Sequence, residues 1–153
     1  MRNRRRAQSG QTLITFTLAM VLFLFGLFVA TVDLVFLYNR YTTVSAAAQI
    51  AAQAGANTID PNSLYSGTVP QLDVFNAPGV CRSAGNTAAL ATGVTSCSVV
   101  DNPQHPGQCP NICAVHAVVT ETVTLPLSLF GVSSVVSASA DAAPVTGDLS
   151  PGP

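Results

Sequence analysis

The sequence predicts an α+β protein in which a long N-terminal transmembrane and stalk helix carries a small C-terminal antiparallel β-sheet domain stapled by disulfides. An uncharged apolar stretch near the N-terminus, helical spacing that continues beyond it, and alternating strands near the C-terminus predict this fold. The expected divisions are a basic cytoplasmic leader (1–10), a transmembrane and stalk helix (11–56), an extracytoplasmic α+β domain (57–143) and a disordered tail rich in Pro and Gly (144–153).

Charge is scarce and unevenly distributed in this chain. Charged residues make up 8% of its 153 residues, whereas globular proteins usually contain about 25%. A chain of this length has room for about one domain. Nucleic-acid binding depends largely on basic patches, and the chain beyond the leader is acidic, so no nucleic-acid partner is expected. Four of the six arginines lie at the N-terminus: Arg2, Arg4, Arg5 and Arg6.

The predicted membrane span covers residues 12–32, and no charged residue occurs between Arg6 and Asp33. At a rise of 1.5 Å per residue, such a helix extends roughly 30 Å, the thickness of the hydrocarbon core. Because the arginines precede the span, the positive-inside rule places the N-terminus in the cytoplasm and the rest of the chain outside. A cleaved signal peptide is the alternative, although its apolar region is usually only about 7–15 residues long.

The helical pattern continues after the span as a stalk. Apolar residues recur at intervals of three and four positions up to Ala56, and no proline occurs before Pro61. Small residues allow another surface to approach a helix closely. We expect the small-residue face to pack on the protein's own C-terminal domain, with a contact between molecules as the alternative. This face consists of Ala48, Ala51, Ala52 and Gly55.

The segment 57–111 is predicted to be rich in loops, because turn signals such as those at 60–62 and 77–79 are frequent in it. One short helix is expected over 83–91 and one strand over 94–100. From Val115 to Thr124, inward apolar residues alternate with others as in a half-buried strand, and 132–142 repeats the pattern more weakly. These strands predict a small antiparallel sheet that packs on the stalk helix.

All four cysteines lie in the part of the chain that is predicted to be exported. An even number of cysteines in an oxidising compartment predicts two disulfides, for which three connectivities exist. We favour Cys81 with Cys97 and Cys109 with Cys113. In so small a domain, two bridges at roughly 2–4 kcal/mol each would supply a large share of the stability.

A second interpretation of Cys109 and Cys113 is a zinc site or a redox pair, because His105 and His116 are close in sequence. Three residues separate the cysteines, whereas thioredoxin-type motifs have two, so a disulfide is favoured. Glu121 is the only glutamate and the aspartates are scattered, so each carboxylate is expected to be solvated. The sequence therefore predicts no catalytic, metal or cofactor site and no enzyme activity.

Residues 4–18 resemble the start of class III (type IV) signal sequences, in which basic residues precede a glycine that prepilin peptidase cuts after. In this chain the apolar stretch follows Gly10 directly, so the cut would fall between Gly10 and Gln11. The alanine-rich end of the helix at 46–56 and the two C-terminal strands at 115–142 follow this start. This order of segments is similar to the TadE/TadG-like pseudopilins of tight-adherence (Flp) pilus systems.

The resemblance covers the first 56 residues and the C-terminal strands. It implies a structural or assembly component, a minor pseudopilin, held in the cell membrane by a single pass or incorporated in a surface pilus. The implied partners are the membrane, other pilin, pseudopilin or pilus-assembly subunits, and prepilin peptidase. Thr15 stands where pilins carry a glutamate, five residues after the glycine. The alternative is a signal-anchored envelope protein that binds a ligand or partner and is unrelated to pili.

Overall fold

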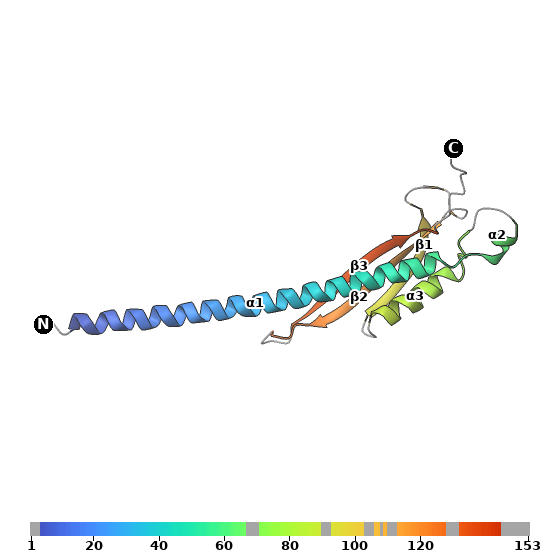
Figure 1. The fold of residues 1–153 in the computed structure, drawn as a ribbon. Helices are drawn as coiled ribbons and strands as arrows, with labels where there is room; N and C mark the ends of the chain where they lie inside the picture. The colour runs from blue at the N-terminus through green and yellow to red at the C-terminus, as the bar shows by residue number, and fades with distance from the viewer. Residues whose placement is uncertain are drawn as a thin grey trace, which may run out of the picture.

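The computed structural model describes residues 4–66, 71–89, 93–102, 106–107, 109, 113–127 and 132–144, with side chains from Thr12 onward. The C-terminal half of one long helix is part of a two-layer α+β domain, and its N-terminal half extends away from that domain (Figure 1). This arrangement confirms the predicted fold class. The elements are α1 (Arg4–Ala56), α2 (Pro61–Tyr65), α3 (Ala77–Ala88), β1 (Gly93–Asp101), β2 (Cys113–Thr124) and β3 (Ser133–Ala142).

Helix α1 runs for 53 residues without interruption. The prediction of one continuous helix that ends at Ala56 is confirmed. The N-terminal boundary differs, because α1 already begins at Arg4, inside the segment 1–10 that was expected to be a separate leader. No proline interrupts this segment, so the helical backbone extends through it.

Threonine hydroxyls within the apolar half of α1 find acceptors in the helix itself. Thr17 donates to the carbonyl oxygen of Leu13 at 2.9 Å, and Thr31 donates to that of Leu27 at 2.8 Å. Each acceptor lies one turn earlier, which is the usual local bond of a helical threonine. These residues therefore satisfy their polar groups without water, as burial in lipid requires.

The three strands form one antiparallel sheet in the order β1-β2-β3. Ala117 of the central strand lies opposite Cys97 of β1 and Ala140 of β3. The predicted pairing of the two C-terminal strands is therefore confirmed. The inward set of β2 is buried as its alternation predicted, at Val115, Ala117, Val119 and Val123.

Helices α1 and α3 cover one face of the sheet, and the core lies between these two layers (Figure 1). Near the end of α1, Ala51 and Ala52 pack with Cys81 of α3 and Val115 of β2. Closer to the apolar half, a second group of buried residues continues the core. It comprises Val44, Ala47, Ala48, Ala89, Val119, Val123 and Val136.

Helix α3 begins at Ala77, so the prediction of a helix over 83–91 placed its start too late and its end too far. Pro78 occupies the first turn, where its missing N–H costs no hydrogen bond. Just before the helix, Asp73 Oδ1 accepts from the backbone N–H groups of Phe75 and Asn76, both at 3.1 Å. Hydrogen bonds from the Asn76 side chain and from these N–H groups lower the pKa of Asp73. The segment 77–79 therefore starts a helix instead of forming a turn.

The turn signal at 60–62 also starts a helix, the five-residue α2. Pro61 again stands in the first turn, and Asp60 Oδ1 accepts from the N–H of Asn62 at 2.9 Å. An isolated antiparallel bridge between Ile59 and Leu72 closes the loop around this helix. The described part of 57–111 therefore contains two helices and one strand, where one helix and one strand were predicted.

Both favoured disulfide pairings are confirmed. Cys81 of α3 is bonded to Cys97 of β1, with their Cα atoms 6.3 Å apart. Cys109 is bonded to Cys113 at the start of β2, with a Cα separation of 4.8 Å. The first bridge ties α3 to the sheet. His105 and residues 145–153, most of the predicted tail, lie outside the described residues.

Candidate functional site

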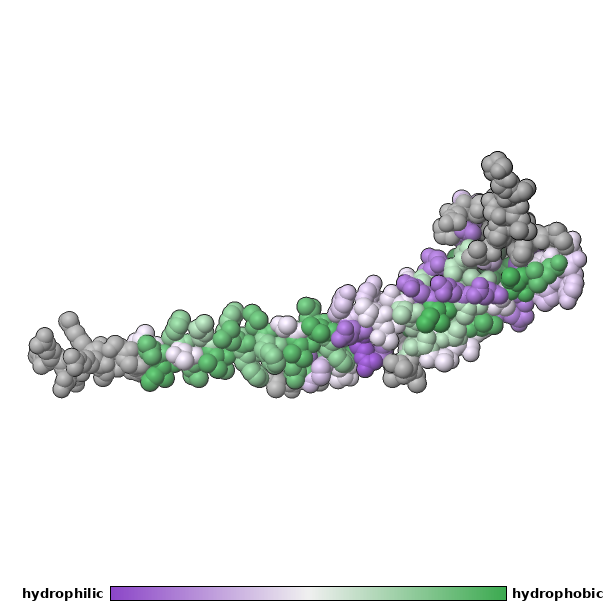
Figure 2. Space-filling view, viewed as in Figure 1, coloured by the Kyte–Doolittle hydropathy of each residue, from purple (hydrophilic) through white to green (hydrophobic). Residues whose placement is uncertain are grey.

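The N-terminal half of α1 is an exposed apolar surface. Its large side chains, from Leu13 to Phe28, are each more than half exposed, and apolar residues cover this half on the face seen in Figure 2. Soluble proteins rarely leave so large an apolar surface uncovered. Among the described residues, one helix, Thr12–Ala56, is long and apolar enough to cross a membrane, and none of its most apolar stretch is buried. These properties are consistent with a single-pass membrane anchor.

The predicted orientation and processing residues lie at the start of this helix. Arg2 lies outside the described residues. The others are described only as backbone of α1, so their predicted roles stay predictions. They are Arg4, Arg5, Arg6, Gly10 and Gln11.

The small-residue face of α1 packs on the protein's own domain, as expected. Ala48, Ala51 and Ala52 are buried, and so is Gly55. A Cβ atom added at Gly55 would lie 2.9 Å from both Cys81 Cβ and Val115 Cγ1. This face is therefore occupied within the molecule and is not a surface for a second one.

A Gly55→Ala variant is expected to lose about 1–2 kcal/mol of unfolding free energy, because overpacking a core outweighs the better helix propensity of alanine. The control is Gly79→Ala on α3, where an added Cβ meets no atom within 4 Å among those described. That variant should match or exceed the wild type in stability. Unfolding of both in urea, in mild detergent, measures the difference. Equal stability of the two variants would contradict the close contact at Gly55.

Glu121 is a buried charged residue whose position the sequence did not predict. It was expected to be solvated, but it lies on the inward face of β2 and is only 5% exposed. Its Oε1 lies 3.7 Å from Nη1 of Arg40, whose guanidinium also sits over the Phe36 ring at 5.4 Å from the centroid. A signal was present, since Glu121 shares its side of the strand with Val119 and Val123. The ion pair links the stalk to the central strand.

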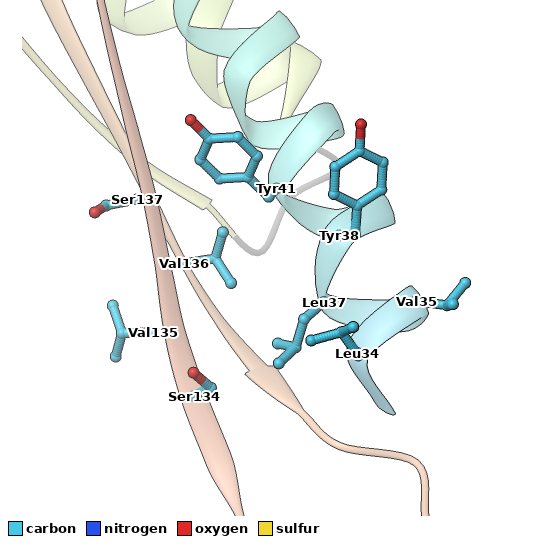
Figure 3. Close-up of a pocket in the computed structure, with 9 residues that line it drawn as sticks. All are labelled: Leu34, Val35, Leu37, Tyr38, Tyr41, Ser134, Val135, Val136 and Ser137. Carbon is cyan, nitrogen blue, oxygen red and sulfur yellow. The ribbon is translucent and has the colours of Figure 1, made fainter. Parts of the chain in front are cut away.

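An open apolar groove of about 660 Å³ lies between α1 and β3 (Figure 3). In Figure 3, Leu34, Leu37 and Tyr41 point from the helix towards the strand, and Val136 points from the strand towards the helix. The Tyr41 hydroxyl lies at the end of the groove away from Leu34, whereas Tyr38 lies on the side of the helix away from β3 (Figure 3). The lining residues are Leu34, Val35, Leu37, Tyr38, Tyr41, Ser134, Val135, Val136 and Ser137.

The β2–β3 hairpin reaches the point where the apolar half of α1 ends. The backbone N–H of Leu127, just after β2, donates to Asp33 Oδ1 at 3.3 Å. Asp33 is the first charged residue after the uncharged stretch. The sheet domain therefore begins immediately at the end of the candidate span, and the groove opens beside it.

The cysteine and histidine residues do not form a metal or dithiol site in the part of the chain that is described. Cys113 is buried and bonded to Cys109, so neither sulfur is a thiolate ligand. His116 Nδ1 lies 2.6 Å from Asp141 Oδ1 on the neighbouring strand. Among the described residues, no three His, Cys, Asp or Glu side chains gather as metal ligands.

The fold and these surfaces define a class of architecture, an anchor-type helix continuous with a small disulfide-bonded α+β domain. Comparisons with models of known protein families, with curated proteins and with solved structures found no match to this chain. The functional argument therefore depends on the geometry and the chemistry of the chain itself.

Proposed function

We propose that this protein is a structural or assembly component of a tight-adherence, type IV-like pilus, a TadE-like minor pseudopilin anchored by α1. The observation that carries the proposal is the division of α1 into two halves. The first half is apolar and exposed, whereas the second half forms the core of a small antiparallel domain. An exposed apolar helix is stable in lipid, and it can also be covered by helices of other subunits. A subunit that is stored in the membrane and then delivered to an assembly needs a helix that is stable in lipid and also against neighbouring helices.

The proposed topology has the N-terminus in the cytoplasm and the domain outside. Two independent features support it. Four arginines precede the span, and one arginine, Arg40, follows it within 20 residues. Both disulfides lie in the domain, and such bonds persist in extracytoplasmic, oxidising compartments.

Contacts with other pilin-like subunits are assigned to the exposed half of α1. The small-residue face beyond Val44 is already buried against the sheet and α3. The surface between Leu13 and Phe28, in contrast, is exposed along its length. In the proposed function this surface faces lipid in the membrane and neighbouring helices in an assembly.

Co-expression with an active prepilin peptidase is expected to remove residues 1–10 and to leave Gln11 as the N-terminus. Intact mass and N-terminal sequencing of the membrane fraction measure this directly. A Gly10→Val variant should keep the leader, because a bulky residue replaces the glycine at the cut. The control is Gly26→Val within the span, where an added Cβ meets no described atom within 4 Å, and it should be cut like the wild type.

An uncut wild-type chain, in cells that process an authentic prepilin, would count against the pseudopilin. It would favour the second candidate, a signal-anchored envelope protein that binds a ligand or partner. The observation that favours this candidate is Thr15, which stands five residues after Gly10. A threonine has no charge with which to neutralise the N-terminal amine that cleavage would create.

A further inference from the structure

The apolar groove between α1 and β3 lies within reach of the membrane surface. Its helical lining begins at Leu34, directly after Asp33, and ends at Tyr41. At 1.5 Å per residue, Leu34 lies about 3 Å, Leu37 about 8 Å and Tyr41 about 14 Å beyond the end of the span at residue 32. The polar interfacial layer of each leaflet is roughly 5–8 Å thick. Leu34 and Leu37 therefore fall within that layer, whereas Tyr41 lies beyond its outer edge.

The lining has the chemistry of a membrane interface. None of the described residues that line it is acidic or basic, and Leu34 is 68% exposed. The Tyr41 ring lies along the groove, and its hydroxyl lies at the end away from the span (Figure 3). Tyrosine is enriched at membrane interfaces because its ring prefers the acyl boundary and its hydroxyl prefers water.

The groove is also continuous with the lipid-facing surface of α1. One charged residue, Asp33, separates them, and its Oδ1 accepts the N–H of Leu127 from the hairpin. The exposed apolar side chains on either side of Asp33, such as Leu27 and Leu34, lie seven residues apart on one face of α1 and form one surface that runs from the span into the groove. This continuity identifies the occupant.

We infer that the end of the groove nearest the span, at Leu34 and Ser134, binds the part of a phospholipid acyl chain next to the headgroup, in the leaflet that faces the domain. This inference depends on the membrane anchoring in the proposed function. The bound lipid covers the apolar walls contributed by α1 and β3 and holds the hairpin end of the sheet against the bilayer. The domain is thereby seated on the membrane at a fixed height, and its other end, near α2 and α3, projects away.

Single tryptophans test this inference, since the chain contains no tryptophan of its own. Leu34→Trp and Ser134→Trp place the probe on the two walls of the groove. Phe23→Trp places it in the middle of the span. Phe75→Trp, at a position that is 96% exposed at the far end of the domain, is the matched aromatic control. The full-length variants are reconstituted in phosphatidylcholine vesicles whose acyl chains are unlabelled, or brominated either near the headgroup or deep in the bilayer.

Shallow bromines are expected to lower the emission of both groove probes about twofold, in keeping with an interfacial position. Deep bromines should quench the Phe23→Trp probe most strongly, and the Phe75→Trp probe should respond to neither. If the span probe is quenched and the groove probes are not, the lipid inference is wrong and the anchor stands. If the span probe is not quenched, the anchoring itself is wrong.

A different occupant would produce its own pattern. Groove probes that emit at shorter wavelength without any quenching would be covered by protein. A dependence of that shift on the protein-to-lipid ratio would identify a second copy of the chain. Either result overturns the lipid assignment. Quenching of Leu34→Trp alone would also overturn it, because a bound lipid contacts the β3 wall as well.

Discussion

A Cys81→Ala, Cys97→Ala double variant is expected to lose about 3 kcal/mol of the domain's unfolding free energy. The bridge joins α3 to β1 across a sequence separation of 16 residues, and removing it lets the unfolded chain explore many more conformations. Cys81 is also fully buried in the cluster that contains Ala51, Ala77 and Val115. Loss of the bridge therefore weakens the packing of α3 on both α1 and the sheet.

The matched control is the Cys109→Ala, Cys113→Ala double variant. Its bridge spans a separation of 4 residues, and the entropy of closing so short a loop is smaller, worth about 2 kcal/mol. Pulse proteolysis in urea, on full-length protein in mild detergent without reductant, compares the two variants with the wild type. An equal loss in both, or a larger loss in the control, would contradict a principal role for the Cys81–Cys97 bridge.

Much of the fold follows from local patterns in the sequence. The uncharged stretch and the uninterrupted helical spacing predicted one helix to Ala56, because no proline or turn signal occurs before that point. The alternation that places Val115, Val119 and Val123 on one side of a strand predicted the buried face of β2. In both cases the period of the side chains directly encodes which surface is covered.

The wrong predictions came from sequence signals that fit two different local structures. Pro78 and Pro61 were interpreted as turn residues, but proline is also common in the first turn of a helix. In both cases an aspartate just before the proline accepts backbone N–H groups and favours the start of a helix. Asp60 supplies a cap to α2, and Asp73 accepts N–H groups just before α3.

Features that join distant segments could not be derived from the sequence alone. The groove has one wall from α1 and another from β3, and its existence depends on how the hairpin lies along the stalk. Glu121 belongs to the same category. Its alternation indicated the inward face, but the partner that makes burial tolerable, Arg40, lies on another element. Without a visible partner, solvation was the reasonable expectation for a carboxylate.

An Arg40→Met variant is expected to destabilise the domain by about 2–3 kcal/mol, less than the ~3–5 kcal/mol typical when a fully buried pair is broken. The Glu121 side chain is 7% exposed, whereas the Arg40 side chain is 37% exposed and keeps part of its hydration. Methionine preserves much of the apolar stem beside Phe36 and removes the charge. The carboxylate of Glu121 then stays between helix and sheet without its positive neighbour. Urea unfolding of the full-length protein measures the loss.

A Glu121→Gln variant in the Arg40→Met background should recover part of that loss, because a neutral amide is less costly to bury than a carboxylate. The control is Arg82→Met at an exposed arginine on α3, which should change the stability by less than about 0.5 kcal/mol. The four-membered cycle of Arg40 and Glu121 variants isolates the pairwise energy. Glu121 has further interactions in the structure, so its own single variant also measures these. If the two substitutions are simply additive, the ion pair does not hold the stalk to β2, and the packing of Val44 and Val119 has to account for that contact.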